Sequence, residues 1–254
     1  MSSSFVVVIP ARYSSSRLPG KILLPIDGKP MVQHVYERAM KSAASQVVIA
    51  ADDKKIMDAV HEFGGNAVLT SPNHQSGTDR LEEASNILKL KDEDIVVNVQ
   101  GDEPLIPPAV INQVASNLAK DTECSVSTLY EKIKNIETLL DPNAVKVVAD
   151  NYSRAIYFSR APIPFPRDDM DGLTFKPESK IGDAFRHIGI YGYRVSLLRQ
   201  FVDWPMAPLE GIEKLEQLRV LYNGKKIHVE EACEAVPAGV DTVSDLERIK
   251  KIFK

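Results

Sequence analysis

The sequence predicts an α/β protein built on a predominantly parallel mixed sheet with helices on both faces. Apolar, β-branched runs suited to buried strands alternate with segments whose apolar residues recur at helical spacing. The 254 residues, of which 44% are hydrophobic, are enough to bury one sizeable core. We therefore expect a single domain over residues 1–254.

The first half of the chain supplies most of this alternation. Residues 5–9 form a β-branched run typical of a central parallel strand, and Pro30 stands where a helix would have its first turn. Gly64 and Gly65 are typical of the residues that end a helix. The predicted strands are 5–9, 46–51, 66–69, 95–99 and 124–129, and the predicted helices are 31–43, 54–63, 78–90 and 107–118.

The second half predicts a change in the sheet. From residue 145 the β-rich runs are closely spaced, so we expect the sheet to become mixed, whereas the proline-rich residues 160–180 lack periodicity and predict an arm or loop. Thr242, with Asp245 three residues later, predicts the start of the last helix by a variant of the capping box. The other predicted strands are 145–149, 154–158, 188–193 and 227–232, and the other predicted helices are 195–202 and 209–222.

Composition and charge argue against several functional classes. The formal charge is −4 and the cations gather in a few loops, which argues against a nucleic-acid-binding surface. No apolar run approaches the ~20 residues that cross a bilayer, and the first residues lack the regions of a signal peptide, so we expect a cytoplasmic protein without membrane insertion. Cys124 and Cys233 lack partners at metal-ligand spacing and predict reduced thiols.

The loop after the first strand carries the strongest functional signal. Pro10 ends the strand at the edge where open parallel sheets bind ligands, and the loop then supplies Arg12, Arg17 and Lys21. The guanidinium of an arginine can donate two hydrogen bonds to phosphate oxygens, and the ammonium of a lysine supplies a compact positive charge. Gly20 allows the backbone to approach the phosphate closely. The pattern is neither a Walker-type P-loop nor a dinucleotide fingerprint. It predicts a triphosphate-binding loop, with a solvated basic turn as the alternative.

Two aspartates stand where a divalent cation could bind. Asp102 follows the predicted strand 95–99, and Asp241 lies in the turn before the last helix. Mg²⁺ usually takes one or two carboxylates together with phosphate oxygens and water, so the pair would suit it if the fold brings them together. The alternatives are a turn aspartate for Asp102 and a helix-cap aspartate for Asp241.

Other polar groups are candidates for contacts with small-molecule substrates. Ser76, Gly77 and Thr78 precede a predicted helix whose first N–H groups could face a nucleotide, with simple capping by Thr78 as the alternative. The guanidinium of Arg160 can fork onto a carboxylate.

The second half of the chain adds candidates on a strand and on a helix. His187 and Tyr191 are four residues apart at the strand 188–193, a spacing that places both on one face, although a strand histidine is often structural. The predicted helix 209–222 has an apolar stripe, and a solvated surface is the alternative role for its opposite face. That opposite face carries three polar side chains at i, i+3 and i+7, namely Glu210, Glu213 and Gln217.

Five segments of the chain resemble the signature segments of the sugar-activating nucleotidyltransferases, and within them the 3-deoxy-manno-octulosonate cytidylyltransferase family. They follow the order of the family and span almost the whole chain. They are Pro-Ala-Arg-Tyr-Ser-Ser-Ser-Arg-Leu-Pro-Gly-Lys at 10–21 with Gly-Lys-Pro-Met at 28–31, His-Gln-Ser-Gly-Thr-Asp-Arg at 74–80, Asn-Val-Gln-Gly-Asp-Glu-Pro at 98–104, Arg-His-Ile-Gly-Ile-Tyr-Gly-Tyr at 186–193 and Gly-Val-Asp-Thr at 239–242.

The resemblance implies a three-layer, Rossmann-like nucleotidyltransferase fold with a small β-rich substrate and dimer arm at about 151–193. It implies that CTP and 3-deoxy-D-manno-octulosonate (KDO) are the substrates, that Mg²⁺ is the cofactor, and that the chain forms a homodimer. The products would be CMP-KDO, for lipopolysaccharide biosynthesis, and pyrophosphate. Three alternative functions remain open. The chain could activate a related acid (8-amino-KDO or a nonulosonic acid), act as a glycosyltransferase, or be a non-catalytic nucleotidyltransferase-like binding module.

The resemblance also implies roles for single residues. Catalytic roles fall on Arg12, Lys21, Asp102 and Asp241, with the two aspartates as metal ligands. The nucleotide-binding positions are Pro10, Ala11, Arg12, Ser16, Arg17, Lys21, Ala51, Asp52, Ser76, Gly77, Thr78, Arg80, Gln100 and Gly101. The positions that bind the sugar acid are Gln100, Arg160, His187, Tyr191, Glu210, Glu213 and Gln217.

Overall fold

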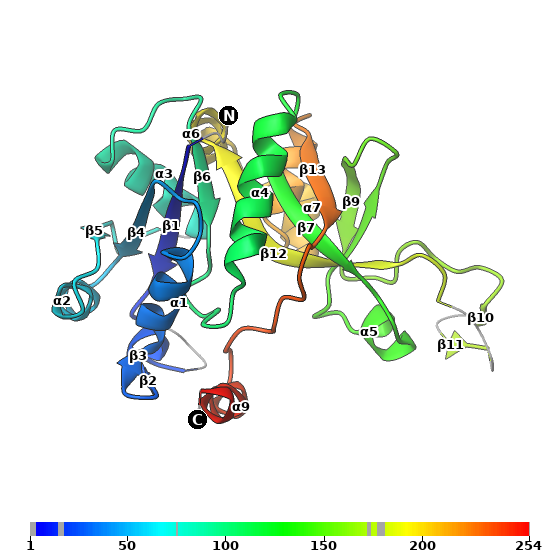
Figure 1. Cartoon of the computed structure of the whole chain (residues 1–254). Helices are drawn as coiled ribbons and strands as arrows, with labels where there is room; N and C mark the ends of the chain where they lie inside the picture. The colour runs from blue at the N-terminus through cyan, green and yellow to red at the C-terminus, as the bar shows by residue number, and fades with distance from the viewer. Residues whose placement is uncertain (1–3, 15–17, 75, 172–173, 177–180, 254) are drawn as a thin grey trace.

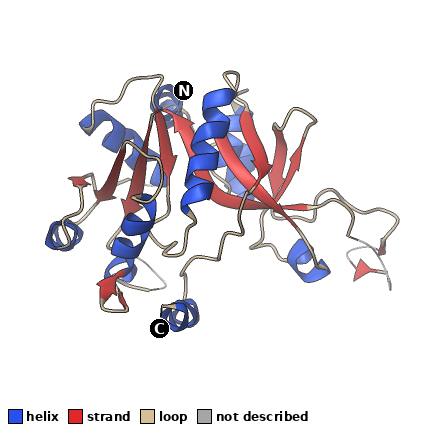
Figure 2. Cartoon of the chain, in the orientation of Figure 1, coloured by secondary structure: helices blue, strands red, loops and turns tan. Residues whose placement is uncertain are grey.

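A computed structural model of the chain shows a central sheet with helices on both faces, as predicted (Figures 1 and 2). It describes residues 4–14, 18–74, 76–171, 174–176 and 181–253. The strands are β1 (Phe5–Ala11), β2 (Pro25–Ile26), β3 (Lys29–Pro30), β4 (Gln46–Ala51), β5 (Ala67–Leu69), β6 (Ile95–Asn98), β7 (Val126–Lys132), β8 (Lys146–Ala149), β9 (Ala155–Ser159), β10 (Met170–Asp171), β11 (Thr174–Phe175), β12 (Phe185–Arg194) and β13 (Ile227–Glu231). The helices are α1 (Met31–Ala39), α2 (Lys54–Glu62), α3 (Gly77–Ile87), α4 (Pro108–Lys120), α5 (Ile136–Leu140), α6 (Val195–Asp203), α7 (Pro208–Glu213), α8 (Gln217–Tyr222) and α9 (Val243–Ile252), with a short 3₁₀ turn η1 (Lys21–Leu23).

The main sheet is mixed, and its topology gathers several strand ends at one edge. Its order is β13-β7-β12-β6-β1-β4-β5, with β8 joined to β12 and β9 joined to β8. β1 is parallel to β4 and β6, whereas β12 is antiparallel to both β6 and β7. The carboxyl ends of β1, β4 and β6 therefore lie together, at the lower edge of the sheet in Figure 1, on the side where α9 lies. Such an edge is where open α/β sheets bind ligands.

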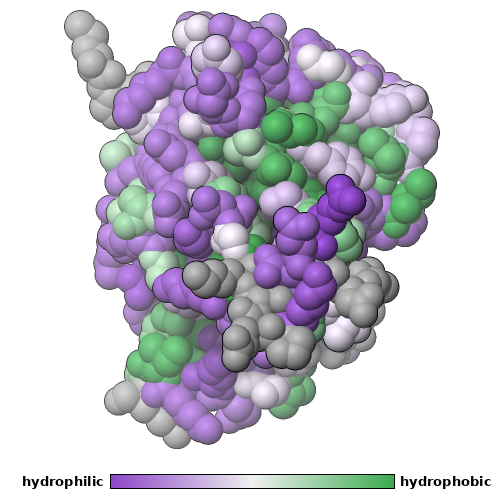
Figure 3. All heavy atoms as spheres, turned by 90° about the vertical axis from the view of Figure 1, so that its right-hand side faces the viewer, coloured by the Kyte–Doolittle hydropathy of each residue, from purple (hydrophilic) through white to green (hydrophobic). Residues whose placement is uncertain are grey.

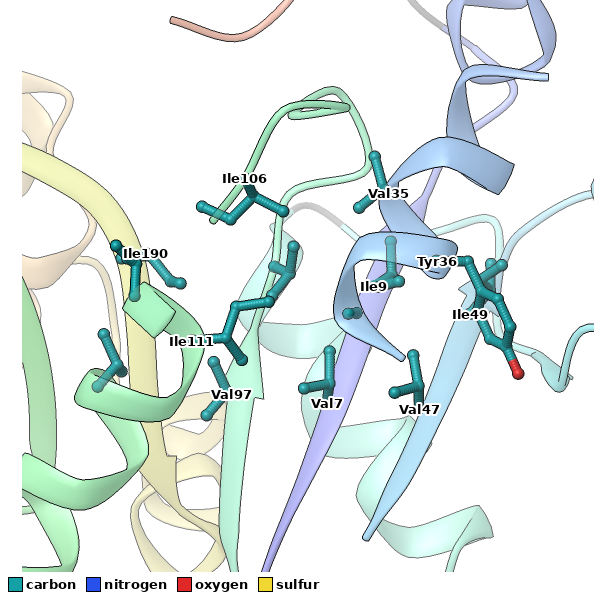
Figure 4. Packing of buried hydrophobic residues seen from close by; sticks show 14 of the residues in the cluster. Val7, Ile9, Val35, Tyr36, Val47, Ile49, Val97, Ile106, Ile111 and Ile190 are labelled. Atoms are coloured by element: carbon teal, nitrogen blue, oxygen red, sulfur yellow. The ribbon is translucent and has the colours of Figure 1, made fainter. Parts of the chain in front are cut away.

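Alternate side chains of the central strands enter two separate layers of core. Val7 belongs to the same buried cluster as Val35 of α1 and Ile111 of α4, on one face of the sheet (Figure 4). Val8 belongs to the opposite cluster, with Leu81 of α3. Full burial of such a side chain contributes about 1.5–3 kcal/mol, so packing on both faces holds the strands and the loops at their ends firmly in place.

The structure corrects the sequence prediction at several elements. The predicted helix 209–222 is two helices, α7 and α8, because Lys214 takes a left-handed conformation (φ 54°) that ends the first one. The predicted helix 31–43 ends at Ala39. The missed elements, α5 and the hairpins β2–β3 and β10–β11, are too short to show a hydrophobic period.

The last helix returns to the beginning of the chain. Thr242 is its N-cap and forms a capping box with Asp245, as predicted. The helix and the turn before it pack against the β2–β3 hairpin and the start of α1, in a cluster of Ile26, Met31, Val240, Leu246 and Ile249. The turn that contains Asp241 is therefore anchored on both sides.

The proline-rich region packs against a small cluster at the far end of β7. Phe175 and Ile181 pack against Ile133, Leu139 and Ala184 at the far end of β7. The β10–β11 hairpin lies in this region, and Pro177 lies outside the described residues. The single domain and the dimer arm stay predictions.

The fold also bears on membrane insertion and on the two thiols. Within the described ranges, no helix combines the length and the hydropathy needed to cross a membrane. Cys124 and Cys233 are both free thiols, the first buried and the second exposed.

Candidate active site

Three charged side chains that are far apart in the sequence meet at the carboxyl edge of the sheet. The ammonium Nζ of Lys21 lies 2.6 Å from Oδ2 of Asp102 and 3.2 Å from Oδ1 of Asp241. Lys21 is only 9% exposed, and Asp102 is half-buried. The fold thus brings together the two carboxylates on which the metal prediction depends.

Backbone contacts explain why the two aspartates are close. The N–H of Val240 donates a hydrogen bond of 2.9 Å to the carbonyl of Asp102. A Cβ at Gly239 would lie 3.1 Å from the same carbonyl, so the two turns pack against each other at the distance that a glycine permits. Asp241 does not cap α9, since Thr242 does, and the helix-cap alternative for Asp241 is wrong.

A backbone hydrogen bond joins two parts of the loop that carries the cations. The N–H of Gly20, at φ 65°, donates to the carbonyl of Tyr13 over 3.2 Å, which places Lys21 at the start of η1. Arg12 is half-buried directly after β1, and its positive charge acts on Arg80. Ser16 and Arg17, two predicted nucleotide-binding residues, lie outside the described residues.

The strand ends beside this loop approach each other closely. A Cβ at Gly101 would lie 2.9 Å from the carbonyl of Pro10, which is closer than real Cβ contacts allow. Gln100 and Gly101 follow β6, while Pro10 and Ala11 end β1. We expect a side chain at position 101 to push the two loops apart.

A buried ion pair stabilises the part of the site that is predicted to bind the nucleotide. Arg80 is fully buried and donates to Oδ2 of Asp52 over 3.3 Å and to the hydroxyl of Thr70 over 2.5 Å. The other oxygen of Asp52 accepts from the N–H of Tyr13 over 2.9 Å. Asp52 follows Ala51 at the end of β4, so this carboxylate ties the cation-bearing loop to α3.

The N-terminus of α3 lies beside the same edge. Ser76 is its N-cap and forms a capping box with Asp79, so simple capping by Thr78 is wrong. Gly77 is the first helical residue. The hydroxyl of Thr78 instead donates to Oε2 of Glu216 over 2.6 Å.

The two predicted residues of β12 share a face of the sheet, as expected. The ring centroids of His187 and Tyr191 are 5.3 Å apart, although the strand register shifts between them. Burial lowers the pKa of His187 to about 3, helped by the charge of Arg186, so the imidazole is neutral near pH 7. Its Nε2 is 2.9 Å from the hydroxyl of Thr128, which is a structural contact.

The three polar residues expected on one helix face are separated by the break at Lys214. Both oxygens of Glu210 pair with the guanidinium of Arg219, at 2.6 and 2.8 Å. Glu213 accepts from the hydroxyl of Ser159 over 2.6 Å, which ties α7 to β9. The single-face interpretation is therefore wrong. Glu210 and Gln217 are both buried, and Gln217 lies at the start of α8.

Arg160 is engaged by backbone carbonyls. Its Nε donates to Glu213 over 2.7 Å and one terminal nitrogen donates to Pro142 over 2.8 Å, while the other lies 3.5 Å from the carbonyl of Lys214. A fork onto a substrate carboxylate would require these bonds to break. The guanidinium thus has a structural position, and its contact with the sugar acid stays a prediction.

The structure adds Glu216, which the sequence analysis did not single out. One carboxylate oxygen accepts from Thr78, and the other, Oε1, is buried and has no hydrogen-bond partner in the described structure. Its charge also acts on Tyr191, whose pKa is raised well above its usual value, mainly by burial. Glu216 lies beyond the break at Lys214, so helical spacing from Glu213 does not identify it.

A second acidic residue, Glu103, was also missed, although it lies in the 98–104 segment. Burial raises its pKa to about 8, and the charge of Asp102 adds to this, so the carboxyl is mostly protonated at neutral pH. Its Oε2 is buried without a hydrogen-bond partner. No sequence signal distinguishes a buried carboxyl here from an exposed one.

The two carboxylates at this edge of the sheet are suitable ligands for a hard cation that also binds oxygens of a substrate. No group of three or more His, Cys, Asp or Glu side chains converges among the residues that the structure describes. Asp102 and Asp241 alone supply two carboxylates, which is the usual protein contribution to a Mg²⁺ bound also by phosphate oxygens and water.

We expect the His187→Gln variant to lose less folding stability than the parent chain as the pH falls. The native pKa, about 3, is below the unfolded value of about 6.5, so this histidine stabilises the fold fully above pH 6.5 and progressively less as the pH falls. One such group contributes a slope of up to about 1.4 kcal/mol per pH unit. Urea unfolding at pH 7, 6 and 5 should show a shallower slope in the variant, and His61→Gln, at an exposed position of α2, is the control. An unchanged slope in His187→Gln would contradict the assignment.

Comparisons with known proteins show which family the chain resembles. A family model described as Cytidylyltransferase matches residues 6–227. The chain is 60% identical to a 3-deoxy-manno-octulosonate cytidylyltransferase of Cellvibrio japonicus (99% of this chain, 98% of the relative) and 56% identical to one of Saccharophagus degradans (99% of both). The solved structure of a CMP:2-keto-3-deoxy-manno-octonic acid synthetase complexed with CTP superimposes with a TM-score of 0.88, at 42% identity over 98% of both chains.

Proposed function

The chain belongs to the cytidylyltransferase family, and we propose that it transfers CMP from CTP to the anomeric hydroxyl of KDO, with release of pyrophosphate. The observation that carries this proposal is the convergence of Lys21, Asp102 and Asp241 beside the loop that follows β1. The relatives at 51–60% identity carry the name of this activity, and they do not favour a related acid as acceptor.

The reaction forms one bond to phosphorus and breaks another. The anomeric oxygen of KDO attacks the α-phosphorus of CTP, the bond from that phosphorus to the bridging oxygen breaks, and pyrophosphate leaves. Such a transfer needs positioning and charge neutralisation more than a protein nucleophile. Lys21 and Arg12 would neutralise the charge that grows on pyrophosphate.

The cofactor of this proposal is Mg²⁺, held by Asp102 and Asp241. When bound, it would supply positive charge at the α-phosphate and lower the pKa of the attacking hydroxyl. The support is the donor set, in which two carboxylates reach toward one point near the phosphate-binding loop.

The proposed sugar-acid subsite lies between β12 and the start of α8. Tyr191 and Glu216 border it, and the orphaned Oε1 of Glu216 suits a hydroxyl donor of the sugar. Product use in lipopolysaccharide biosynthesis and a cytoplasmic location, where CTP is available, are parts of the same proposal.

Pyrophosphate release from CTP with a panel of acceptors tests the function. We expect release with KDO, and much less with 8-amino-KDO, N-acetylneuraminate or no acceptor. Replacing CTP by UTP or ATP should also abolish the signal. Release that is equal for all acids, or that does not require an acid, would overturn the proposal.

We expect Glu216→Gln to raise the KM for KDO with little change in the KM for CTP. A hydrogen bond to a charged group contributes about 1.5–3 kcal/mol, which corresponds to roughly 10–100-fold. The measurement is steady-state kinetics with each substrate varied in turn. Glu62→Gln, at an exposed position of α2, is the control. An equal effect on both substrates would remove Glu216 from the sugar side.

We also propose a homodimer that uses the end of the molecule formed by β9 and α7. Hydrophobic atoms gather on the surface seen from this end (Figure 3). Ile212 of α7 is 79% exposed and Ile156 of β9 is 60% exposed, and β9 is paired on one side only, with β8, among the described strands. Exposed apolar patches and open strand edges are typical of interfaces.

Sedimentation at micromolar concentration should therefore show a dimer for the parent chain. Ile212→Glu should shift the chain toward monomer because a charge would enter the apolar contact. Ile87→Glu, an exposed position on α3, should leave the dimer intact. A monomeric parent chain would remove the dimer, and a dimeric Ile212→Glu would move the interface elsewhere.

A further inference from the structure

A cation of the chain itself occupies the point toward which the two metal-binding carboxylates are directed. Lys21 Nζ donates to Oδ2 of Asp102 and Oδ1 of Asp241, at 2.6 and 3.2 Å. The proposed role of Lys21, neutralising the charge on pyrophosphate, requires no contact with either aspartate. The contact with both aspartates therefore needs a separate explanation.

The ammonium and a divalent cation would compete for these oxygens. Mg²⁺ binds carboxylate oxygens at about 2.0–2.1 Å, closer than either N–O distance of Lys21. An ion that contacts both oxygens would lie within a few ångströms of Nζ, where two like charges repel strongly. Lys21 must therefore leave this position before both aspartates bind a metal.

Departure of Lys21 is costly unless a new anion receives it. Its side chain is 11% exposed, so an ammonium displaced without a partner would remain poorly solvated. A triphosphate bound by the adjoining loop, which begins at Arg12, offers oxygens to the same side chain. Exchange of partners then removes the cost, because the metal neutralises the aspartates while the phosphate neutralises the lysine.

We propose that Lys21 is the internal counter-ion of the metal site. In the free chain it holds Asp102 and Asp241 together, and it moves to the triphosphate when nucleotide and metal bind. Metal affinity is thereby coupled to nucleotide, and the free chain binds a divalent cation weakly at this site. The inference rests on the proposed function, which assigns the two aspartates as metal ligands.

Titration of free Mn²⁺ by electron paramagnetic resonance, without nucleotide, tests the inference. We expect Lys21→Met to bind Mn²⁺ at least about 10-fold more tightly than the parent chain, within the usual 5–150-fold range of coupling between sites. Lys21→Arg, which keeps a cation, should remain weak. Lys226→Met, which removes a lysine paired with Glu123, is the matched control and should bind like the parent. The double variant Lys21→Met/Asp102→Asn should lose the gain.

Thermal unfolding supplies a second measurement that does not depend on turnover. With a chelator present, Lys21→Met should unfold at a lower temperature than the parent, because the two carboxylates have lost a shared cation. Added Mn²⁺ or Mg²⁺ should raise the unfolding temperature of Lys21→Met more than that of the parent. Lys21→Gln replaces Lys21→Met in both measurements if the methionine variant is not recovered folded.

The outcomes separate this inference from the proposed function. If Lys21→Met binds Mn²⁺ no more tightly than the parent, while Asp102→Asn still abolishes turnover, the counter-ion role is wrong and the metal site stands. If Lys21→Met and the double variant bind Mn²⁺ equally and Asp102→Asn keeps its turnover, the metal assignment itself is wrong and the inference is overturned with it.

Discussion

Asp102→Asn and Asp241→Asn should each lower the turnover of pyrophosphate release by at least ~10²-fold, the scale for losing a positioned electrostatic stabiliser. Each change removes a negative charge that faces Lys21 and keeps the size of the side chain. The metal proposed for this site would lose one of its two protein ligands. Rates measured at saturating CTP and KDO, over a series of Mg²⁺ concentrations, give the loss.

Controls separate this effect from a loss of fold. Circular dichroism of both variants should match that of the parent chain. Asp92→Asn, which removes an exposed carboxylate paired with Arg199, should keep full turnover. Near-parent turnover in Asp102→Asn or Asp241→Asn would exclude that residue from the metal site.

Glu210→Ala should have the largest effect on stability, with a loss of about 3–5 kcal/mol in the free energy of unfolding. Glu210 pairs through both oxygens with Arg219, and the two side chains are 8% and 13% exposed. Arg219 also lies over the ring of Phe201, 4.3 Å from its centroid. Truncating Glu210 leaves the guanidinium of Arg219 largely buried and without this carboxylate as its partner.

A double-mutant cycle measured by urea unfolding tests the pair. Arg219→Ala should also destabilise, and the double variant should lose clearly less than the sum of the two single losses. The half-buried pair of Lys29 and Glu37, with side chains 45% and 41% exposed, is the control, where Glu37→Ala should cost no more than about 1 kcal/mol. Additive losses for Glu210 and Arg219 would show that the pair does not act as a unit.

The elements of the central sheet could be predicted because their residues carry a strong local pattern. Val7 and Ile9 enter one core layer and Val8 the other, so the continuous apolar run reports a strand buried on both faces. The superposition on the CMP:2-keto-3-deoxy-manno-octonic acid synthetase structure agrees with the nucleotidyltransferase fold that the resemblance implied.

The site was only partly predictable, because local patterns do not report tertiary partners. Asp102 and Asp241 could be selected by their places at a strand end and in a turn, and the fold brings them together. Arg160 could be selected as a side chain able to bind a carboxylate, but its hydrogen bonds to carbonyls of two other segments could not be predicted. The helix break at Lys214 depends on a single left-handed residue, which an apolar stripe does not reveal.

The order in which the chain is synthesised adds a consequence of the position of α9. Lys21 and Asp102 are synthesised well before Asp241, which lies in a turn anchored by α9 on the β2–β3 hairpin. A nascent chain begins to fold from its N-terminal part while synthesis continues. The sheet would therefore form around an incomplete centre, and a product interrupted before residue 241 would keep the phosphate loop while lacking the second carboxylate. Synthesis of the turn that carries Asp241 thus acts as the last assembly step of the candidate site.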